Sequence, residues 1–251
     1  MRNTLIVEPG GRAGHENMRR DYLLLRAAQE EVLFVRLYRW NPGCVSFGRN
    51  EPARRRYNRQ RIGDLGLDTV RRPTGGRAVW HEHEVTYCVA GPVTTFGSLG
   101  DTYIFIHEML VSAMARLGID AKLARKTSRA PGLESGACFA SPVGGEVVVD
   151  GKKLIGSAQI REGNTFLQHG SILLEDGQDV IEKISNGSLV GLHSTSIRAV
   201  TGERVGFDAV ATAVVDEVME SWTGQWEHGV VPEDPDASKL DFTDAEWTWR
   251  R

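Results

Sequence analysis

The chain has 251 residues, of which 41% are hydrophobic and 25% are charged, and its formal net charge is −3. This length and composition are typical of a globular protein, and we favour a single domain. The near balance of charge argues against a protein whose main role is to bind the nucleic-acid backbone. No apolar run approaches the roughly 20 residues that span a bilayer, and the first apolar stretch is too short for a signal peptide. We therefore expect a cytoplasmic protein with no membrane contact.

The first half of the chain alternates between strand-like and helix-like segments. Residues 4–8 and the β-branched and aromatic residues 32–40 are typical of strands, and a third strand is expected around 85–90. Residues 16–30 place apolar side chains at a helical period, and a second helix is expected at 57–65, before a glycine.

The second half begins with the clearest helix of the chain, at 102–118. Asp101 is a plausible N-cap, and Gly118 ends the helix. Residues 146–160 predict a hairpin, because the Asp-Gly pair in its middle tolerates the positive φ that a tight turn needs. A further strand at 165–175 would complete a three-stranded meander. A last amphipathic helix is predicted at 207–222, followed by an acidic tail.

Three cysteines occur, at positions 44, 88 and 138, and no two of them form a CxxC pair. Neither a disulfide framework nor a metal site is indicated, so a free thiol is available for reaction. Cys138 lies in a loop of small residues, SGACFASP, and Lys153 follows in GKKLIG. A lysine could favour the thiolate and stabilise the oxyanion of a thioester, which would make an acyl-transfer site. Alternatively, Cys138 is a packed small residue and Lys153 an ordinary surface lysine.

The segment RRPTGGRAVWH, residues 71–81, is a second unusual feature. Arg72, Gly75, Gly76, Arg77 and His81 suit an anionic or extended ligand, because glycine lets backbone donors approach it closely. A glycine turn between solvated arginines explains the pattern equally well.

Two further features have a structural and a functional interpretation. His169 in LQHGSILL is either a structural strand histidine or a site residue. The basic run Arg54, Arg55, Arg56 is either a solvated face or a surface that docks an acidic carrier protein.

The lipoate and octanoate branch of the biotin/lipoate protein ligase superfamily is what the motifs resemble, taken in order: ENM with Asp21 following, VSFGRN, RRPTGGRAVWH, SGACFASP, GKKLIGSAQ and LQHGSILL. They cover the chain from about Glu16 to Glu175. The likeness is strongest to cysteine-dependent octanoyltransferases of the LipM type. Cys138 falls in the CFA-containing loop of that group, Arg77 replaces the third glycine that lipoate ligases tend to carry, and little chain remains for an accessory domain.

The resemblance implies a single α+β domain of mixed and antiparallel sheets packed with helices. We expect residues 1–230 to form the catalytic domain, and 231–251 a tail that packs on it or trails from it. Cys138 would be the nucleophile, and Lys153 would contact the acyl carbonyl. The residues that would line the acyl pocket are Arg72, Gly75, Gly76, Arg77, His81, Gly156, Gln159 and His169.

The implied reaction moves octanoate from octanoyl-acyl carrier protein to a lysine of a lipoyl domain or of glycine cleavage H protein, through a Cys138 thioester, in lipoate biosynthesis. No cofactor is needed, because the thioester is already activated. Three other functions remain open: an ATP-dependent lipoate ligase that uses ATP and Mg²⁺, an amidotransferase between carrier proteins, and a non-catalytic module that binds an acylated carrier or a lipoyl domain.

Overall fold

A computed structural model describes residues 2–28, 32–124, 144–187, 193–233 and 241–251 of the chain. Cys138 lies outside these described residues. Among the helices of the described ranges, none is both long and apolar enough to cross a membrane.

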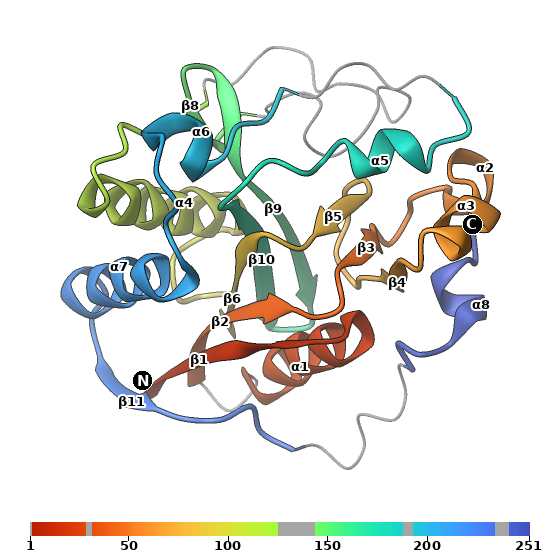
Figure 1. Ribbon diagram of the computed structural model, residues 1–251. Coiled ribbons are helices and arrows are strands. Elements are labelled where there is room, and N and C mark those ends of the chain that lie inside the picture. The colour runs from red at the N-terminus through yellow and green to blue at the C-terminus, as the bar shows by residue number, and fades with distance from the viewer. Residues whose placement is uncertain (1, 29–31, 125–143, 188–192, 234–240) are drawn as a thin grey trace.

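A large mixed sheet runs through the middle of the molecule (Figure 1). Within the described residues it has eight strands in the order β11-β1-β2-β6-β10-β9-β8-β7. β1 pairs in parallel with both of its neighbours, and the other pairings are antiparallel. The strand bounds are β1 Arg2–Arg12, β2 Val32–Trp40, β6 Glu84–Pro92, β7 Lys122–Leu123, β8 Val147–Val149, β9 Lys152–Glu162, β10 Thr165–Leu173 and β11 Gln225–His228.

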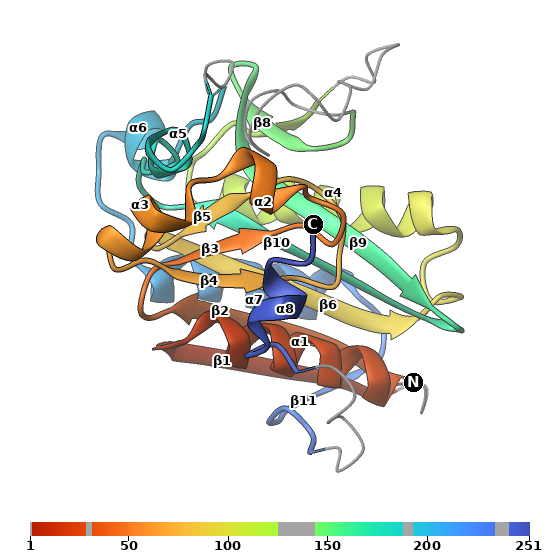
Figure 2. The ribbon, with the colours of Figure 1, turned by 90° about the vertical axis from the view of Figure 1, so that its right-hand side faces the viewer.

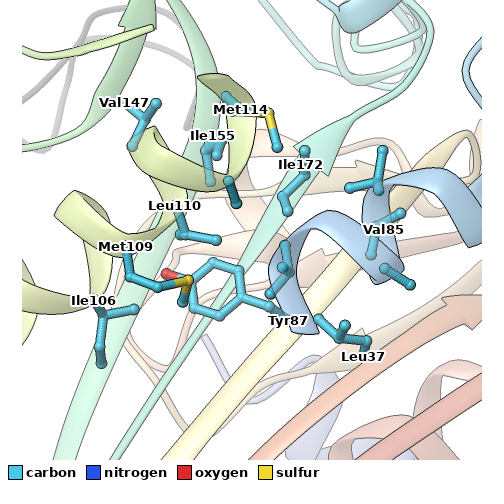
Figure 3. Close-up of a cluster of buried hydrophobic side chains, with 14 of the residues drawn as sticks. Leu37, Val85, Tyr87, Ile106, Met109, Leu110, Met114, Val147, Ile155 and Ile172 are labelled. Atoms are coloured by element: carbon cyan, nitrogen blue, oxygen red, sulfur yellow. The ribbon is translucent and has the colours of Figure 1, made fainter. Parts of the chain in front are cut away.

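Helices α4 (Leu99–Arg116) and α7 (Phe207–Ser221) cover one face of this sheet, and α1 (Gly14–Ala27) lies on the other face (Figures 1 and 2). Figure 3 shows the core beneath α4 and α7, where apolar side chains of the helices meet the inward side chains of β2, β6, β9 and β10. Burying such side chains contributes about 1.5–3 kcal/mol each. A second core lies between α1 and the sheet.

A small sheet, in the order β4-β3-β5, stands beside the large one. Its strands are β3 (Cys44–Phe47), β4 (Asp68–Arg71) and β5 (Val79–His81). Four short helices lie near it or join the last elements: α2 (Ala53–Arg56), α3 (Arg59–Asp64), α5 (Val180–Lys183) and α8 (Ala245–Thr248). A further short helix, α6 (Ile197–Thr201), leads toward α7.

The predicted fold class is confirmed, since mixed sheets pack with helices in one domain. The meander β8-β9-β10 and its turn are also confirmed: Asp150 has φ 48° and Gly151 has φ 75°. Two details of the prediction were wrong. Ser98, not Asp101, is the N-cap of α4, because Asp101 is the third residue of a capping box. The helix expected at 57–65 is α3, which is shorter because Asn58 is its N-cap, and the preceding helix α2 was not predicted.

Candidate active site

A narrow cavity of about 30 Å³ opens where the small sheet meets strands β6, β9 and β10 of the large sheet. Such a volume holds only a few water molecules. The cavity unites the motifs that are far apart in the sequence. Its lining residues are Met18, Tyr38, Trp40, Ser46, Arg72, Val79, His81, Thr86, Gly156, Ser157, Ala158, His169, Gly170 and Ser171. Of the predicted pocket residues, Arg72, His81, Gly156 and His169 therefore lie together.

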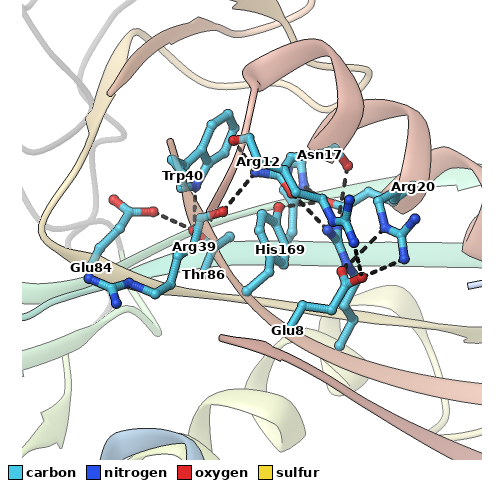
Figure 4. A network of polar contacts seen from close by, with 12 residues as sticks. Glu8, Arg12, Asn17, Arg20, Arg39, Trp40, Glu84, Thr86 and His169 are labelled. Carbon is cyan, nitrogen blue, oxygen red and sulfur yellow. Dashed lines mark hydrogen bonds and ion pairs between the residues drawn. The ribbon is translucent and has the colours of Figure 1, made fainter. Parts of the chain in front are cut away.

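His81 is buried at the end of β5, and both of its ring nitrogens are engaged. Nδ1 lies 2.8 Å from Glu84 Oε1, and Nε2 lies 2.6 Å from Ser46 Oγ. The ring stacks on Trp40, with 4.1 Å between the ring centroids. Trp40 Nε1 donates to Thr86 Oγ1, and Thr86 in turn donates to Glu84 (Figure 4). Glu84 thus fixes the orientation of two aromatic walls of the cavity.

His169 on β10 is held in the same way as His81, by a carboxylate on one ring nitrogen and a hydroxyl on the other. Its Nδ1 lies 2.8 Å from Asp21 Oδ2, and its Nε2 lies 2.7 Å from Thr74 Oγ1. Burial lowers the pKa of His169 and outweighs the opposing effect of Asp21. The neutral ring donates from Nδ1 to the carboxylate, so Nε2 accepts the hydrogen bond of the Thr74 hydroxyl.

Asp21 also binds Arg36, in addition to His169. Burial alone would raise its pKa, but the hydrogen bond with His169 and the charge of Arg36 lower it overall. Arg36 is fully buried and donates to Asp21 at 2.7 Å and to Glu8 at 2.7 Å, beside the contact of Glu8 with Arg20 (Figure 4). This network joins α1, β1 and β2 behind the cavity.

Arg72 stabilises the loop that contains Gly75, Gly76 and Arg77. Its Nη1 donates to the backbone carbonyl and the hydroxyl of Ser46, and its Nη2 donates to the carbonyls of Gly75 and Arg77. The loop also touches the VSFGRN motif, because a Cβ on Gly48 would lie 1.9 Å from Gly76 O. Gly75, Gly76 and Arg77 are therefore placed next to the cavity and do not line it.

Lys153 is not a surface lysine. It is 1% exposed, and its Nζ donates to Glu146 Oε1 at 2.5 Å, with Glu146 itself buried. Lys153 stands on β9, three residues before Gly156 of the cavity wall, and its backbone pairs with the segment at 193–195. Lys153 and Glu146 compensate each other's charge, and neither is among the residues that line the cavity.

A chain of polar side chains crosses the sheet to α4. Gln159 donates to Gln168, Gln168 to Tyr87, and Tyr87 to Ser157. Ser157 Oγ lies 2.7 Å from Nε2 of His107, whose Nδ1 donates to Gly145 O at 2.6 Å. Gln159 thus supports Ser157, which lines the cavity, and does not line the cavity itself.

The two described cysteines are buried, as the sequence suggested for structural residues. Burial raises the pKa of the Cys44 thiol and of the Cys88 thiol well above the ordinary value, so neither is a ready nucleophile.

The sequence analysis assigned no site role to the residues that hold the two histidines, which are Asp21, Ser46, Thr74 and Glu84, although the first three lie in or next to the motifs of the resemblance. A signal for one of them was present. Asp21 lies three residues after Met18 on the apolar side of the predicted helix, and a carboxylate among core positions is unusual unless it is paired.

Residues 13–219 match the lipoyl protein ligase A/B catalytic domain, and the chain belongs to this family. The resemblance inferred from the motifs is confirmed.

Among its relatives, octanoyltransferase LipM of Kyrpidia tusciae is 34% identical over 238 residues, which span 86% of this chain and 87% of that protein. Octanoyltransferase LipM of Bacillus subtilis is 34% identical over 188 residues, which span 69% of this chain and 66% of that protein.

Solved structures of lipoate ligases share the fold. A lipoate-protein ligase A bound with ATP has a TM-score of 0.82 at 17% identity, over 99% of both chains. A bi-partite lipoate protein ligase from Thermoplasma acidophilum, studied with its E2 lipoyl domain, has a TM-score of 0.77 at 18% identity, over 98% of this chain and 96% of that chain.

Proposed function

We propose that this protein is an octanoyltransferase of lipoate biosynthesis. It moves octanoate from octanoyl-acyl carrier protein to a lysine of a lipoyl domain or of glycine cleavage H protein. The observation that carries the proposal is the family membership combined with relatives named octanoyltransferase LipM that align over most of the chain. Lys153, which the proposal uses to stabilise the oxyanion, is buried and paired with Glu146, and neither of the two is among the residues that line the cavity.

The proposed reaction has two steps. In the first, the Cys138 thiolate attacks the thioester carbonyl, the bond to the carrier sulfur breaks, and the carrier leaves as a thiol after it takes up a proton. In the second, the neutral amine of the target lysine attacks the Cys138 thioester, an amide forms, and the cysteine thiol is restored. Both steps pass through an oxyanion, which Lys153 stabilises. The thioester supplies the activation, so the proposal needs neither nucleotide nor metal.

The cavity is the proposed site of the acyl chain. Its walls include the apolar surfaces of Met18, Tyr38, Trp40 and Val79. Met18 is the most adaptable of them, because its side chain is unbranched.

The test is intact-mass spectrometry of the protein mixed with octanoyl-acyl carrier protein, without ATP, next to Cys138→Ser. We expect an octanoyl adduct on the wild type alone, discharged when a lipoyl domain is added.

The other outcomes would favour other functions. No adduct, together with acylation of the lipoyl domain from free octanoate or lipoate and ATP, would replace the proposal by a lipoate ligase. Faster acylation from an octanoylated H protein than from the acyl carrier protein would indicate an amidotransferase. Complex formation without any acyl shift would leave only a binding module.

A further inference from the structure

Helices α2 and α3 and the last residues of the chain lie together at one end of the molecule (Figures 1 and 2), and these segments are rich in arginine. Residues 49–61 hold six arginines, and their single carboxylate, Glu51, is buried. Two more arginines, Arg250 and Arg251, are brought back to this segment, since Arg54 N donates to Arg251 O at 2.7 Å and Arg250 Nη2 donates to Arg49 O at 2.6 Å. We call these eight residues the arginine face: Arg49, Arg54, Arg55, Arg56, Arg59, Arg61, Arg250 and Arg251.

The charges of this face are poorly balanced. Some exposed arginines elsewhere pair with carboxylates: Arg116 binds Glu217 and Glu220, and Arg198 and Arg204 share Glu175. Within the part of the chain that the structure describes, the exposed members Arg49, Arg54, Arg55, Arg59 and Arg61 form no ion pair. Asp64, at the end of α3, is engaged by Gln60.

Burial and neighbouring arginines both lower the pKa of two arginines at the inner edge of the face, Arg250 and Arg71. Burial lowers the pKa of Arg250, and the charges of Arg49 and Arg251 lower it further. Burial, and then the charge of Arg250, lower the pKa of Arg71 to about 10. Because the whole chain carries a net charge of −3, this is a local concentration of positive charge on an otherwise slightly acidic protein.

The face is also hollowed. A depression of about 440 Å³ lies on it, lined by Arg54, Tyr57, Asn58, Arg59, Asn186 and Trp249. Its polar and aromatic lining, with two arginines at the border, suits a carboxylate-bearing side chain of another protein.

The arginine face is continuous with the loop beside the cavity. Arg49 N donates to Thr74 O at 2.7 Å, and the Thr74 hydroxyl contacts His169, which lines the cavity. Gly48, the residue before Arg49, packs directly on Gly76. A protein bound on the arginine face would therefore sit next to the cavity and could deliver a group to it on a flexible arm.

We propose that the arginine face docks the acidic surface of the carrier protein that delivers the acyl thioester. The inference rests on the proposed function and adds the surface that selects the donor. The acceptor is the poorer match, because it must bring a lysine amine to the site, and a dense group of arginines repels that cation. A donor that presents carboxylates and holds its acyl group on a phosphate-bearing arm has the complementary charge.

The test compares Arg54→Glu/Arg55→Glu with the control Arg2→Glu/Arg161→Glu, which reverses two exposed arginines on β1 and β9. Each variant is acylated by octanoyl-acyl carrier protein and, separately, by octanoyl-pantetheine, a small thioester. In the first variant, kcat/KM for the carrier should fall at least about tenfold, because charge reversal at a docking surface slows association. The rate with octanoyl-pantetheine should stay at the wild-type value. The control should match the wild type with both donors.

Salt gives a second readout. Raising the ionic strength should slow the wild-type reaction with the carrier, and should affect the Arg54→Glu/Arg55→Glu variant much less. An unchanged rate with the carrier in that variant would overturn the docking proposal, as would an equal loss in the control.

Binding separates the docking proposal from the proposed function. Calorimetry with the carrier protein lacking an acyl group should show weaker binding to Arg54→Glu/Arg55→Glu than to the wild type, whether or not any acyl group is transferred. Wild-type protein that binds the carrier but transfers no octanoate would refute the proposed function and keep the docking surface. If the variant instead loses binding of the lipoyl domain and keeps that of the carrier, the assignment to the donor is wrong.

Discussion

Lys153 and Glu146 form a buried ion pair, and each compensates the charge of the other. Lys153→Met removes the group that the proposed mechanism uses to stabilise the oxyanion, and it leaves a buried carboxylate without its cation. We expect turnover to fall about a hundredfold to a thousandfold. The same change should also cost about 3–5 kcal/mol of unfolding free energy.

A double variant separates these two effects. Lys153→Met/Glu146→Gln has no uncompensated charge, so its stability should recover much of the loss while its turnover stays low. Urea unfolding and single-turnover acylation measure the two quantities. Wild-type turnover in the double variant would refute the proposed catalytic role of Lys153.

His107 predicts a pH dependence of stability. Burial lowers its pKa to about 4, whereas an unfolded histidine titrates near pH 6.5. Between these values the unfolded chain binds a proton that the folded chain does not. The unfolding free energy should therefore fall as the pH drops from about 6.5 to about 4, by roughly 3 kcal/mol in total. In His107→Gln this part of the decline should disappear, as followed by urea unfolding at several pH values.

The control for this prediction is His228→Gln, which alters an exposed histidine on β11. It should follow the wild-type curve. If the His107→Gln curve runs parallel to that of the wild type over the same pH range, His107 does not cause this part of the pH dependence of the unfolding free energy.

At the scale of elements, two motifs meet at Gly48 and Gly76. Any side chain on residue 48 would strike the backbone oxygen of Gly76, and backbone cannot yield as a flexible side chain can. Gly48→Ala should therefore lower the unfolding free energy by about 1–3 kcal/mol. Gly63→Ala is a matched change in α3 with nothing within 4 Å of the new methyl group, and it should be neutral or slightly stabilising. Equal thermal midpoints for both variants would contradict this reading of the contact.

Local patterns predicted the elements whose cause is local. The Asp150-Gly151 turn, the meander and the amphipathic helices α4 and α7 follow from residues close in the sequence. The small sheet was not predicted as a unit, because β5 has only 3 residues and its pairing partners lie in other segments. No periodicity reports such non-local pairing.

The same limit applied to the candidate site. His81 and His169 were expected near a pocket, and both line one. Their partners were not predicted, because Asp21 and Thr74 contact His169 across 148 and 95 positions of the chain. The pairing of Lys153 with Glu146 spans only seven positions. It was missed because the hairpin pattern does not reveal that both side chains are buried together.

At the scale of the whole molecule, Arg71 joins segments that are far apart in the sequence. Its guanidinium donates to the carbonyls of Trp247 and Thr248 in α8, and to those of Gly48 and Glu51. Arg71→Met would leave these carbonyls without their donor. We expect a loss of about 3 kcal/mol, since hydrogen bonds to charged groups contribute about 1.5–3 kcal/mol each. Backbone amides of α8 should exchange with solvent much faster.

Hydrogen exchange monitored by mass spectrometry tests this at residues 245–249. Arg204→Met, which changes an exposed arginine paired with Glu175, is the control and should leave that exchange unchanged. Slow exchange of α8 in Arg71→Met would mean that Trp249, packed on Phe47, holds the helix without help from Arg71.

The position of β1 has a consequence for biosynthesis. Residues Arg2 to Leu5 pair with β2 on one side and with Gln225 to His228 of β11 on the other. β2 is synthesised soon after β1, but β11 follows only after most of the chain has been made. At about 5–20 residues per second, this delay is roughly 10–40 seconds. During that time one edge of β1 offers its backbone to any neighbouring nascent chain, so we expect crowding on the ribosome to cause misassembly at Arg2 to Leu5.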